Sequence, residues 1–97
     1  MTYRFLSPAL IELTEAAEFY ESKVPGLGAD FVFEADEAIS RVLDFPEAWS
    51  RISNDYRHCN FRRFPYTIIY SMHSAEEILI VSVFHLHREP LSWKRNL

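Results

Sequence analysis

The feature that most constrains the fold of this chain is a change in hydrophobic period near its middle. Between residues 8 and 45, apolar side chains recur every three or four positions, which is typical of amphipathic helices. Beyond residue 55 the spacing becomes two, in segments rich in Tyr, Ile, Val and Phe, which is typical of β-strands. A chain of 97 residues has room for one domain. Helices followed by strands predict an α+β fold around one core.

Two helices are expected in the first half of the chain. Ser7 and Pro8 indicate the start of the first helix, with serine as the N-cap and proline at the first helical position. This helix ends where it meets the turn sequence Pro25-Gly26-Leu27-Gly28. The second helix ends before Pro46, because the residue that precedes a proline is biased away from helical geometry. The two segments therefore predict a helical hairpin.

Four strands are expected around this hairpin. One comprises residues 2–6, and the other three are Tyr56–Phe61, Tyr66–Met72 and Ile78–Leu86. The last of them is apolar on both faces as far as Phe84, which predicts a central place in the sheet. The expected fold is an N-terminal strand, an α-helical hairpin and then a three-stranded antiparallel meander, forming one sheet packed on the helices. Residues 1–97 form this single domain, and residues 91–97 are expected to form a helical turn.

Composition narrows the class of protein. The single cysteine excludes an intrachain disulfide, and the first residues lack the pattern of a signal peptide. No apolar run approaches the roughly 20 residues of a membrane-spanning helix, so we expect a soluble protein of the cytoplasm with no membrane partner. The net charge of −4 argues against general affinity for nucleic acid. Residues 51–97 nevertheless carry seven basic and four acidic side chains, which leaves room for a local basic site.

Basic side chains are expected to meet at one end of the sheet. Arg62 and Arg63 lie near the start of the middle strand of the meander, and His85 and Arg88 lie at the end of the last strand. Antiparallel neighbours bring these ends together. A neutral histidine can accept the proton of an RNA 2′-hydroxyl group, and guanidinium groups stabilise charge on phosphate. These four residues are therefore the candidate catalytic residues of a phosphodiester-cleaving site.

Three more side chains are candidates for substrate binding. They are His87, on the same strand face as His85, and Tyr66 and Trp93, whose rings are suited to stacking on an unpaired base. Composition alone favours a solvated strand end or a protein interface over a catalytic site. A His-x-His pair is also compatible with zinc, but no Cys-x-x-Cys or His-Glu-x-x-His pattern accompanies it. We therefore expect neither a metal nor a cofactor.

Four segments carry a resemblance to a known family. They are Leu13–Tyr20 running into Pro25–Phe31, Ile39–Ala48, Arg62–Tyr66 with Ile68–Tyr70, and Val83–His85 with Arg88–Pro90 and Trp93. In these segments the chain resembles the RelE/ParE superfamily of small toxins from bacterial type II toxin–antitoxin systems, also called plasmid stabilisation proteins. The last two segments are the most specific and look like the ParE-like branch. The resemblance spans nearly the whole chain and implies the same fold as the hydrophobic pattern.

The resemblance also implies a function that the pattern does not. The partner would be a small cognate antitoxin, encoded beside this gene, whose C-terminal segment wraps and silences the toxin. ParE-type members poison DNA gyrase, whereas RelE-type members cut mRNA in the ribosome. The nuclease members use basic residues, often with His or Tyr, on the sheet and near the C-terminus. Arg62, Arg63, His85 and Arg88 stand where that set is expected.

Two features depart from the nuclease pattern. His87 stands where a second arginine is more usual, and the acidic net charge contrasts with strongly basic ribosome-cutting members. We therefore expect a toxin that acts on gyrase and replication through a protein interaction. A ribosome-dependent mRNA endonuclease and a non-toxic member that only binds its antitoxin are the alternatives. A homodimer and a toxin–antitoxin hetero-oligomer are both compatible with the sequence.

Overall fold

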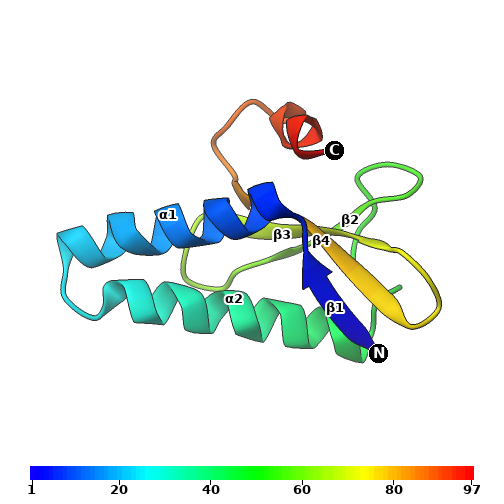
Figure 1. Cartoon of the computed structure of the whole chain (residues 1–97), viewed down its shortest axis with the longest axis horizontal. Helices are drawn as coiled ribbons and strands as arrows, with labels where there is room; N and C mark the ends of the chain where they lie inside the picture. The colour runs from blue at the N-terminus through cyan, green and yellow to red at the C-terminus, as the bar shows by residue number, and fades with distance from the viewer.

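A computed structural model describes residues 1–97 as a helical hairpin lying on one face of a four-stranded sheet (Figure 1). In chain order the elements are β1 (Thr2–Phe5), α1 (Ser7–Lys23), α2 (Leu27–Asp44), β2 (Arg57–Asn60), β3 (Tyr66–Met72), β4 (Glu77–His85) and the 3-10 helix η1 (Ser92–Asn96). The expected α+β class and element order are confirmed, including the helical turn near the C-terminus.

The sheet has the strand order β1-β4-β3-β2 and is mixed. Strands β2, β3 and β4 form the expected antiparallel meander, while β1 pairs with β4 in parallel, from Thr2 opposite Glu77 to Phe5 opposite Ile80. Strand β4 is therefore an inner strand, which explains why it is apolar on both faces. Because β1 ends opposite Ile80, the second half of β4 has no neighbouring strand on that side.

The main hydrophobic core lies between the hairpin and the sheet. Buried side chains of the helices meet those of the strands there: Ala9, Phe31, Ala35, Ile39 and Val42 against Ile68, Tyr70, Ile78, Ile80 and Val83. A smaller cluster lies on the opposite face, where η1 folds back over the sheet (Figure 1). It consists of Ile69, Val81, Phe84 and Trp93. Both faces of the sheet are thus covered, one by the hairpin and the other by the C-terminal segment.

The turn between the helices depends on two glycines. Gly26 has a φ angle of 92°, a left-handed conformation that side chains with a Cβ rarely adopt. A Cβ added at Gly28 would lie 2.6 Å from the carbonyl oxygen of Ala17, so this glycine allows the helices to approach closely. The carboxylate of Glu21 accepts hydrogen bonds from the backbone N–H groups of both glycines at 3.0 Å. This contact satisfies N–H groups at the start of α2 that have no helical partner.

The start of α1 differs from the prediction. Leu6, not Ser7, occupies the N-cap position, and no side chain caps the helix. The backbone N–H of Leu6 still donates to the carbonyl of Ile80 at 2.9 Å, which extends the pairing of β1 with β4. The carbonyl of Leu6 in turn accepts the N–H groups of Ala9 and Leu10. The chain therefore passes directly from strand to helix, and Ser7 is already helical.

Candidate functional site

A groove lies between α1 and the part of β4 that β1 leaves uncovered. It has a volume of about 230 Å³. Its walls are formed by Glu12, Glu15, Ala16 and Phe19 of α1, by Tyr66 of β3 and by Val83, His85 and Arg88 of β4 and the segment after it. Three of the predicted site residues, Tyr66, His85 and Arg88, therefore lie in one groove.

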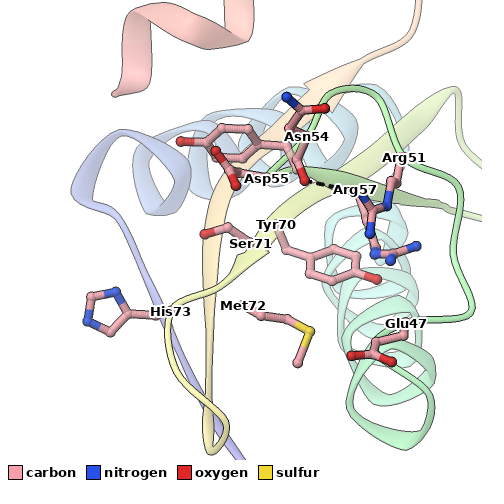
Figure 2. A pocket seen from close by; sticks show the side chains of 10 residues that line it. Glu47, Arg51, Asn54, Asp55, Arg57, Tyr70, Ser71, Met72 and His73 are labelled. Carbon is pink, nitrogen blue, oxygen red and sulfur yellow. Dashed lines mark hydrogen bonds between the residues drawn. The ribbon is translucent and has the colours of Figure 1, made fainter.

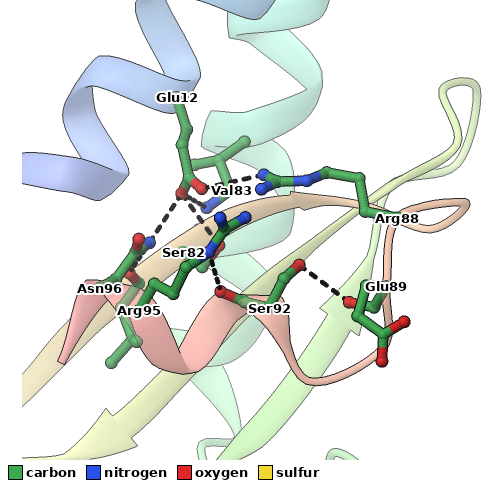
Figure 3. Close-up of polar contacts among 9 residues, drawn as sticks. Glu12, Ser82, Val83, Arg88, Glu89, Ser92, Arg95 and Asn96 are labelled. Carbon is green, nitrogen blue, oxygen red and sulfur yellow. Dashed lines mark hydrogen bonds and ion pairs between the residues drawn. The ribbon is translucent and has the colours of Figure 1, made fainter.

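The carboxylate of Glu12 organises the wall of this groove (Figure 3). Its Oε1 atom accepts hydrogen bonds from Ser82 Oγ at 2.9 Å, from the backbone N–H of Val83 at 3.1 Å and from Asn96 Nδ2 at 3.0 Å. Its Oε2 atom lies 3.5 Å from Nη1 of Arg88. One carboxylate of α1 thus connects the open edge of β4 with η1 and with the segment after β4.

Side chains form hydrogen bonds with the backbone of β4 where no neighbouring strand pairs with it. Asn96 Nδ2 also donates to the carbonyl oxygen of Val81 at 2.9 Å, so side chains satisfy both a donor and an acceptor on this stretch of β4. An edge with satisfied groups is less available to a further strand. Sequence reasoning missed Glu12 and Asn96, since the regular spacing of the glutamates on α1 indicates only a solvated face.

Three rings form a row along the end of the sheet. The ring centroids of Tyr66 and His85 lie 4.9 Å apart and those of His85 and His87 lie 5.1 Å apart, both in edge-to-face geometry. The backbone N–H of His87 donates to Nδ1 of His85 at 3.0 Å. The neutral ring of His85 therefore carries its proton on Nε2. In this arrangement His85 donates from Nε2, and its remaining lone pair is already used by the backbone.

Burial affects the titration of two of these rings. Partial burial, with the nearby His87 and Arg88, lowers the pKa of His85 below the usual 6.5, so the ring is neutral at pH 7. Burial also raises the pKa of Tyr66 above its usual 10, and Tyr20 and Glu12 act in the same direction. The phenol therefore stays protonated and can donate a hydrogen bond into the groove.

The arginine of the groove is held by its surroundings. Arg88 forms the ion pair with Glu12, and its guanidinium carbon lies 5.5 Å from the ring centroid of Phe84. Its positive charge is therefore offset within the protein. A substrate phosphate would have to compete with this carboxylate for the guanidinium group.

The other two candidate arginines lie at the same end of the sheet but on the side of α2. The backbone N–H groups of Arg62 and Arg63 both donate to Oε1 of Glu34 at 3.0 Å. The side chain of Arg63 lies 3.6 Å from a carboxylate oxygen of Asp30. No hydrogen bond or ion pair joins either arginine to His85 or Arg88. The four candidate catalytic residues therefore share one end of the fold without forming one contact cluster.

The interpretation of Trp93 as a stacking platform does not fit its position. Its side chain is 3% exposed and packs with Ile69, Val81 and Phe84 on the sheet face opposite the hairpin. Tyr56 covers it further, with ring centroids 5.0 Å apart. The reason is that η1 folds back over the sheet and turns the indole inward. Trp93 is therefore a core residue, which a tail sequence with exposed neighbours does not reveal.

Other kinds of site receive no support from the side-chain arrangement. No group of three or more His, Cys, Asp or Glu residues is placed to hold a metal ion. Cys59 is 1% exposed, and burial raises the pKa of its thiol above the usual 9.0, which disfavours the reactive thiolate. Neither α1 nor α2 combines the length and apolar character that crossing a bilayer requires.

The fold and groove define a class of small α+β domains with a helical hairpin on a mixed sheet. Within that class, the sequence profile of a family described as "ParE toxin of type II toxin-antitoxin system, parDE" matches residues 3–90. The chain belongs to this ParE toxin family, and membership implies a cognate antitoxin as its partner.

A solved structure supports the same fold. The chain is similar to a protein chain described as "Chromosomal ParDE TA system from P. aeruginosa", with a TM-score of 0.76 and 14% sequence identity. The match covers 90% of this chain and 97% of the other. A sequence comparison with curated proteins found no match. At 14% sequence identity this similarity shows a shared fold, and it does not assign roles to the residues of the groove.

Proposed function

We propose that this ParE-family toxin acts in the cytoplasm by binding DNA gyrase, and that its antitoxin silences it by covering the toxin surface. The observation that carries this proposal is the ion pair of Glu12 with Arg88, the one candidate arginine that lines the groove. A phosphate in the groove would have to displace this carboxylate, whereas Arg62 and Arg63 lie outside the groove on the side of α2. A site for RNA cleavage needs cationic groups aimed at the reacting phosphate.

The electrostatics of the groove support the same conclusion. With Glu12 paired to Arg88, the carboxylate of Glu15 leaves the lining of the groove with an excess of negative charge, which disfavours the approach of an RNA backbone. The lone pair of His85 at Nδ1 is occupied by the backbone of His87, which weakens the case for a general base. A toxin that works through a protein interface needs neither a free base nor a free cation.

Exposed apolar side chains on the hairpin support a protein interface. Leu10 and Ile11 of α1 and Phe33 of α2 are at least half exposed, and Phe33 reaches 61%. Aromatic and aliphatic residues on a surface favour burial against a partner. We infer that the hairpin surface and the sheet edge become buried when antitoxin binds, as the family resemblance implies.

A second candidate function rests on one specific arrangement. A neutral His85, a protonated Tyr66 and Arg88 lie together in the groove, and these groups are the components of a ribonuclease site. A ribosome that displaced Glu12 from Arg88 would complete it. In that case the chain would be an mRNA endonuclease that becomes active only on its target.

Pulse-labelling after induced expression separates the two functions. We expect DNA synthesis to fall within minutes while protein synthesis continues, for the wild type and equally for the double variant His85→Ala, Arg88→Ala. The control is co-expression of the neighbouring antitoxin gene, which is expected to restore DNA synthesis. An early loss of protein synthesis that disappears in the double variant would establish the endonuclease instead. Unchanged growth at high expression, with the antitoxin still co-purifying, would identify a non-toxic member.

A further inference from the structure

A second hollow, larger than the groove, lies at the other end of β3. It has a volume of about 420 Å³ and is bounded by the last residues of β3 and the segment that leads into β2. Polar and charged side chains of Glu47, Arg51, Asn54, Arg57 and His73 line it, with the ring of Tyr70 at its base (Figure 2). None of the predicted site residues lines this hollow, and the family match assigns no role to it.

Two arginines are placed side by side in it. Arg51 and Arg57 are partners in an isolated antiparallel bridge, so their side chains project from neighbouring positions toward the same hollow (Figure 2). Nη1 of Arg57 donates to the carbonyl oxygen of Trp49 at 2.7 Å, and Nη1 of Arg51 donates to that of Asn54 at 3.4 Å. Each guanidinium group is thus oriented by one backbone carbonyl and retains further N–H groups.

The positive charge of this pair is not offset by an ion pair. The ion pairs of the chain involve Arg4, Arg63 and Arg88. Like charges at directly opposed strand positions repel each other. Two guanidinium groups without an ion pair in one hollow therefore gain from a bound anion.

We propose that this hollow binds the carboxylate of an acidic side chain presented by a protein partner. A guanidinium group matches a carboxylate through two parallel hydrogen bonds, and two guanidinium groups can hold it from both sides. The hollow has room for a side chain with part of its backbone. Glu47 and Asp55 also line the hollow, and their carboxylates repel a dianionic phosphate more than a singly charged carboxylate. The net charge of −4 also disfavours a nucleic acid there.

This contact would be separate from the groove of His85. The hollow adjoins Met72 and His73, whereas the groove adjoins Tyr66 at the opposite end of the same strand. The inference therefore does not depend on gyrase being the target. It assigns a second protein contact, specific for acidic side chains, to the ParE-family chain.

The test is a titration of the purified full chain with short capped peptides, followed by NMR of the arginine side-chain Nε–Hε signals at constant ionic strength. The probes are acetyl-Ala-Glu-Ala-amide, the matched acetyl-Ala-Gln-Ala-amide and sodium phosphate. We expect saturable shifts of Arg51 and Arg57 with the glutamate peptide and no saturable shift with the glutamine peptide. Phosphate is expected to bind at least threefold more weakly.

Three variants make the test specific. Arg51→Gln and Arg57→Gln are each expected to weaken binding of the glutamate peptide at least fivefold, while Arg95→Gln leaves it unchanged. Because Arg57 anchors the loop through Trp49, amide spectra of each variant verify that the fold is retained. Arg51→Glu provides a second, independent test. It is expected to bind acetyl-Ala-Lys-Ala-amide in preference to the glutamate peptide. Equal shifts with both peptides, tighter binding of phosphate, or unchanged binding in folded Arg51→Gln would overturn the proposal.

Discussion

Replacement of Glu12 tests whether one carboxylate holds the open edge of β4. In the variant Glu12→Ala the hydroxyl of Ser82 and the backbone N–H of Val83 lose their acceptor. Both residues are buried, with exposed fractions of 0% and 1%, so their donors depend on the carboxylate as an acceptor. The variant therefore removes a structural contact as well as a wall of the groove.

The loss of unfolding free energy in Glu12→Ala can be worked out from these contacts. A buried donor left without an acceptor costs about 1–3 kcal/mol, so two donors place the loss at about 2–6 kcal/mol. Asn96 keeps its bond to the carbonyl of Val81, and the half-exposed ion pair with Arg88 adds only about 0–1 kcal/mol. The variant Glu12→Gln keeps an oxygen acceptor and should lose about 1 kcal/mol. Small domains have a total stability of about 5–15 kcal/mol, so the effect is large.

Urea unfolding at pH 7, followed by circular dichroism, measures these free energies. The matched control is Glu15→Ala, since Glu15 lines the same groove and no hydrogen bond or ion pair holds its side chain. We expect the control to stay within about 0.5 kcal/mol of the wild type, as is usual for surface substitutions. If Glu12→Ala also unfolded within 0.5 kcal/mol of the wild type, the carboxylate would not hold the strand edge and the reasoning would be wrong.

Three further predictions follow from burial and geometry. Gly28→Ala should lower the free energy of unfolding by about 1–3 kcal/mol, because its Cβ would meet the carbonyl of Ala17 at 2.6 Å. Trp93→Ala should cost about 3–5 kcal/mol in the same assay, as expected for an aromatic core residue and not for a surface ring. The pKa of His85, followed by NMR, should lie below 6.5, and its contribution to stability should be full above that pH and be lost as the pH falls through the lowered value. His85→Gln should remove this part of the pH dependence, and an NMR midpoint at or above 6.5 would contradict the prediction.

Much of the fold follows from local sequence patterns. The predicted strand Tyr66–Met72 coincides with β3, since alternating apolar side chains specify which face meets the helices. The two-faced apolar pattern of Ile78–Phe84 correctly indicates an inner strand. The N-cap at Ser7 was wrong because the pairing of Leu6 with Ile80, a contact between distant segments, determines where the helix begins.

Fewer of the residues of the candidate site could be predicted from the sequence. Tyr66 and His85 could be placed together, because strand register alone makes them neighbours. Glu12 could not be distinguished from the other glutamates of α1, since its partners Ser82 and Asn96 lie 70 and 84 positions away. Trp93 was misinterpreted for a related reason, as only the return of η1 across the sheet buries its ring. Side chains whose roles depend on long-range contacts need the structure.

We propose that this ParE-family chain acts on gyrase through a protein contact that does not require His85 and Arg88 as catalytic groups. The most direct measurement is DNA supercoiling by purified gyrase in the presence of increasing amounts of the chain. We expect supercoiling to fall, the variant His85→Ala, Arg88→Ala to inhibit as strongly as the wild type, and added antitoxin to restore activity. Undiminished supercoiling at a large molar excess of folded toxin, together with mRNA cleavage in a ribosome-containing reaction that the double variant cannot perform, would contradict it.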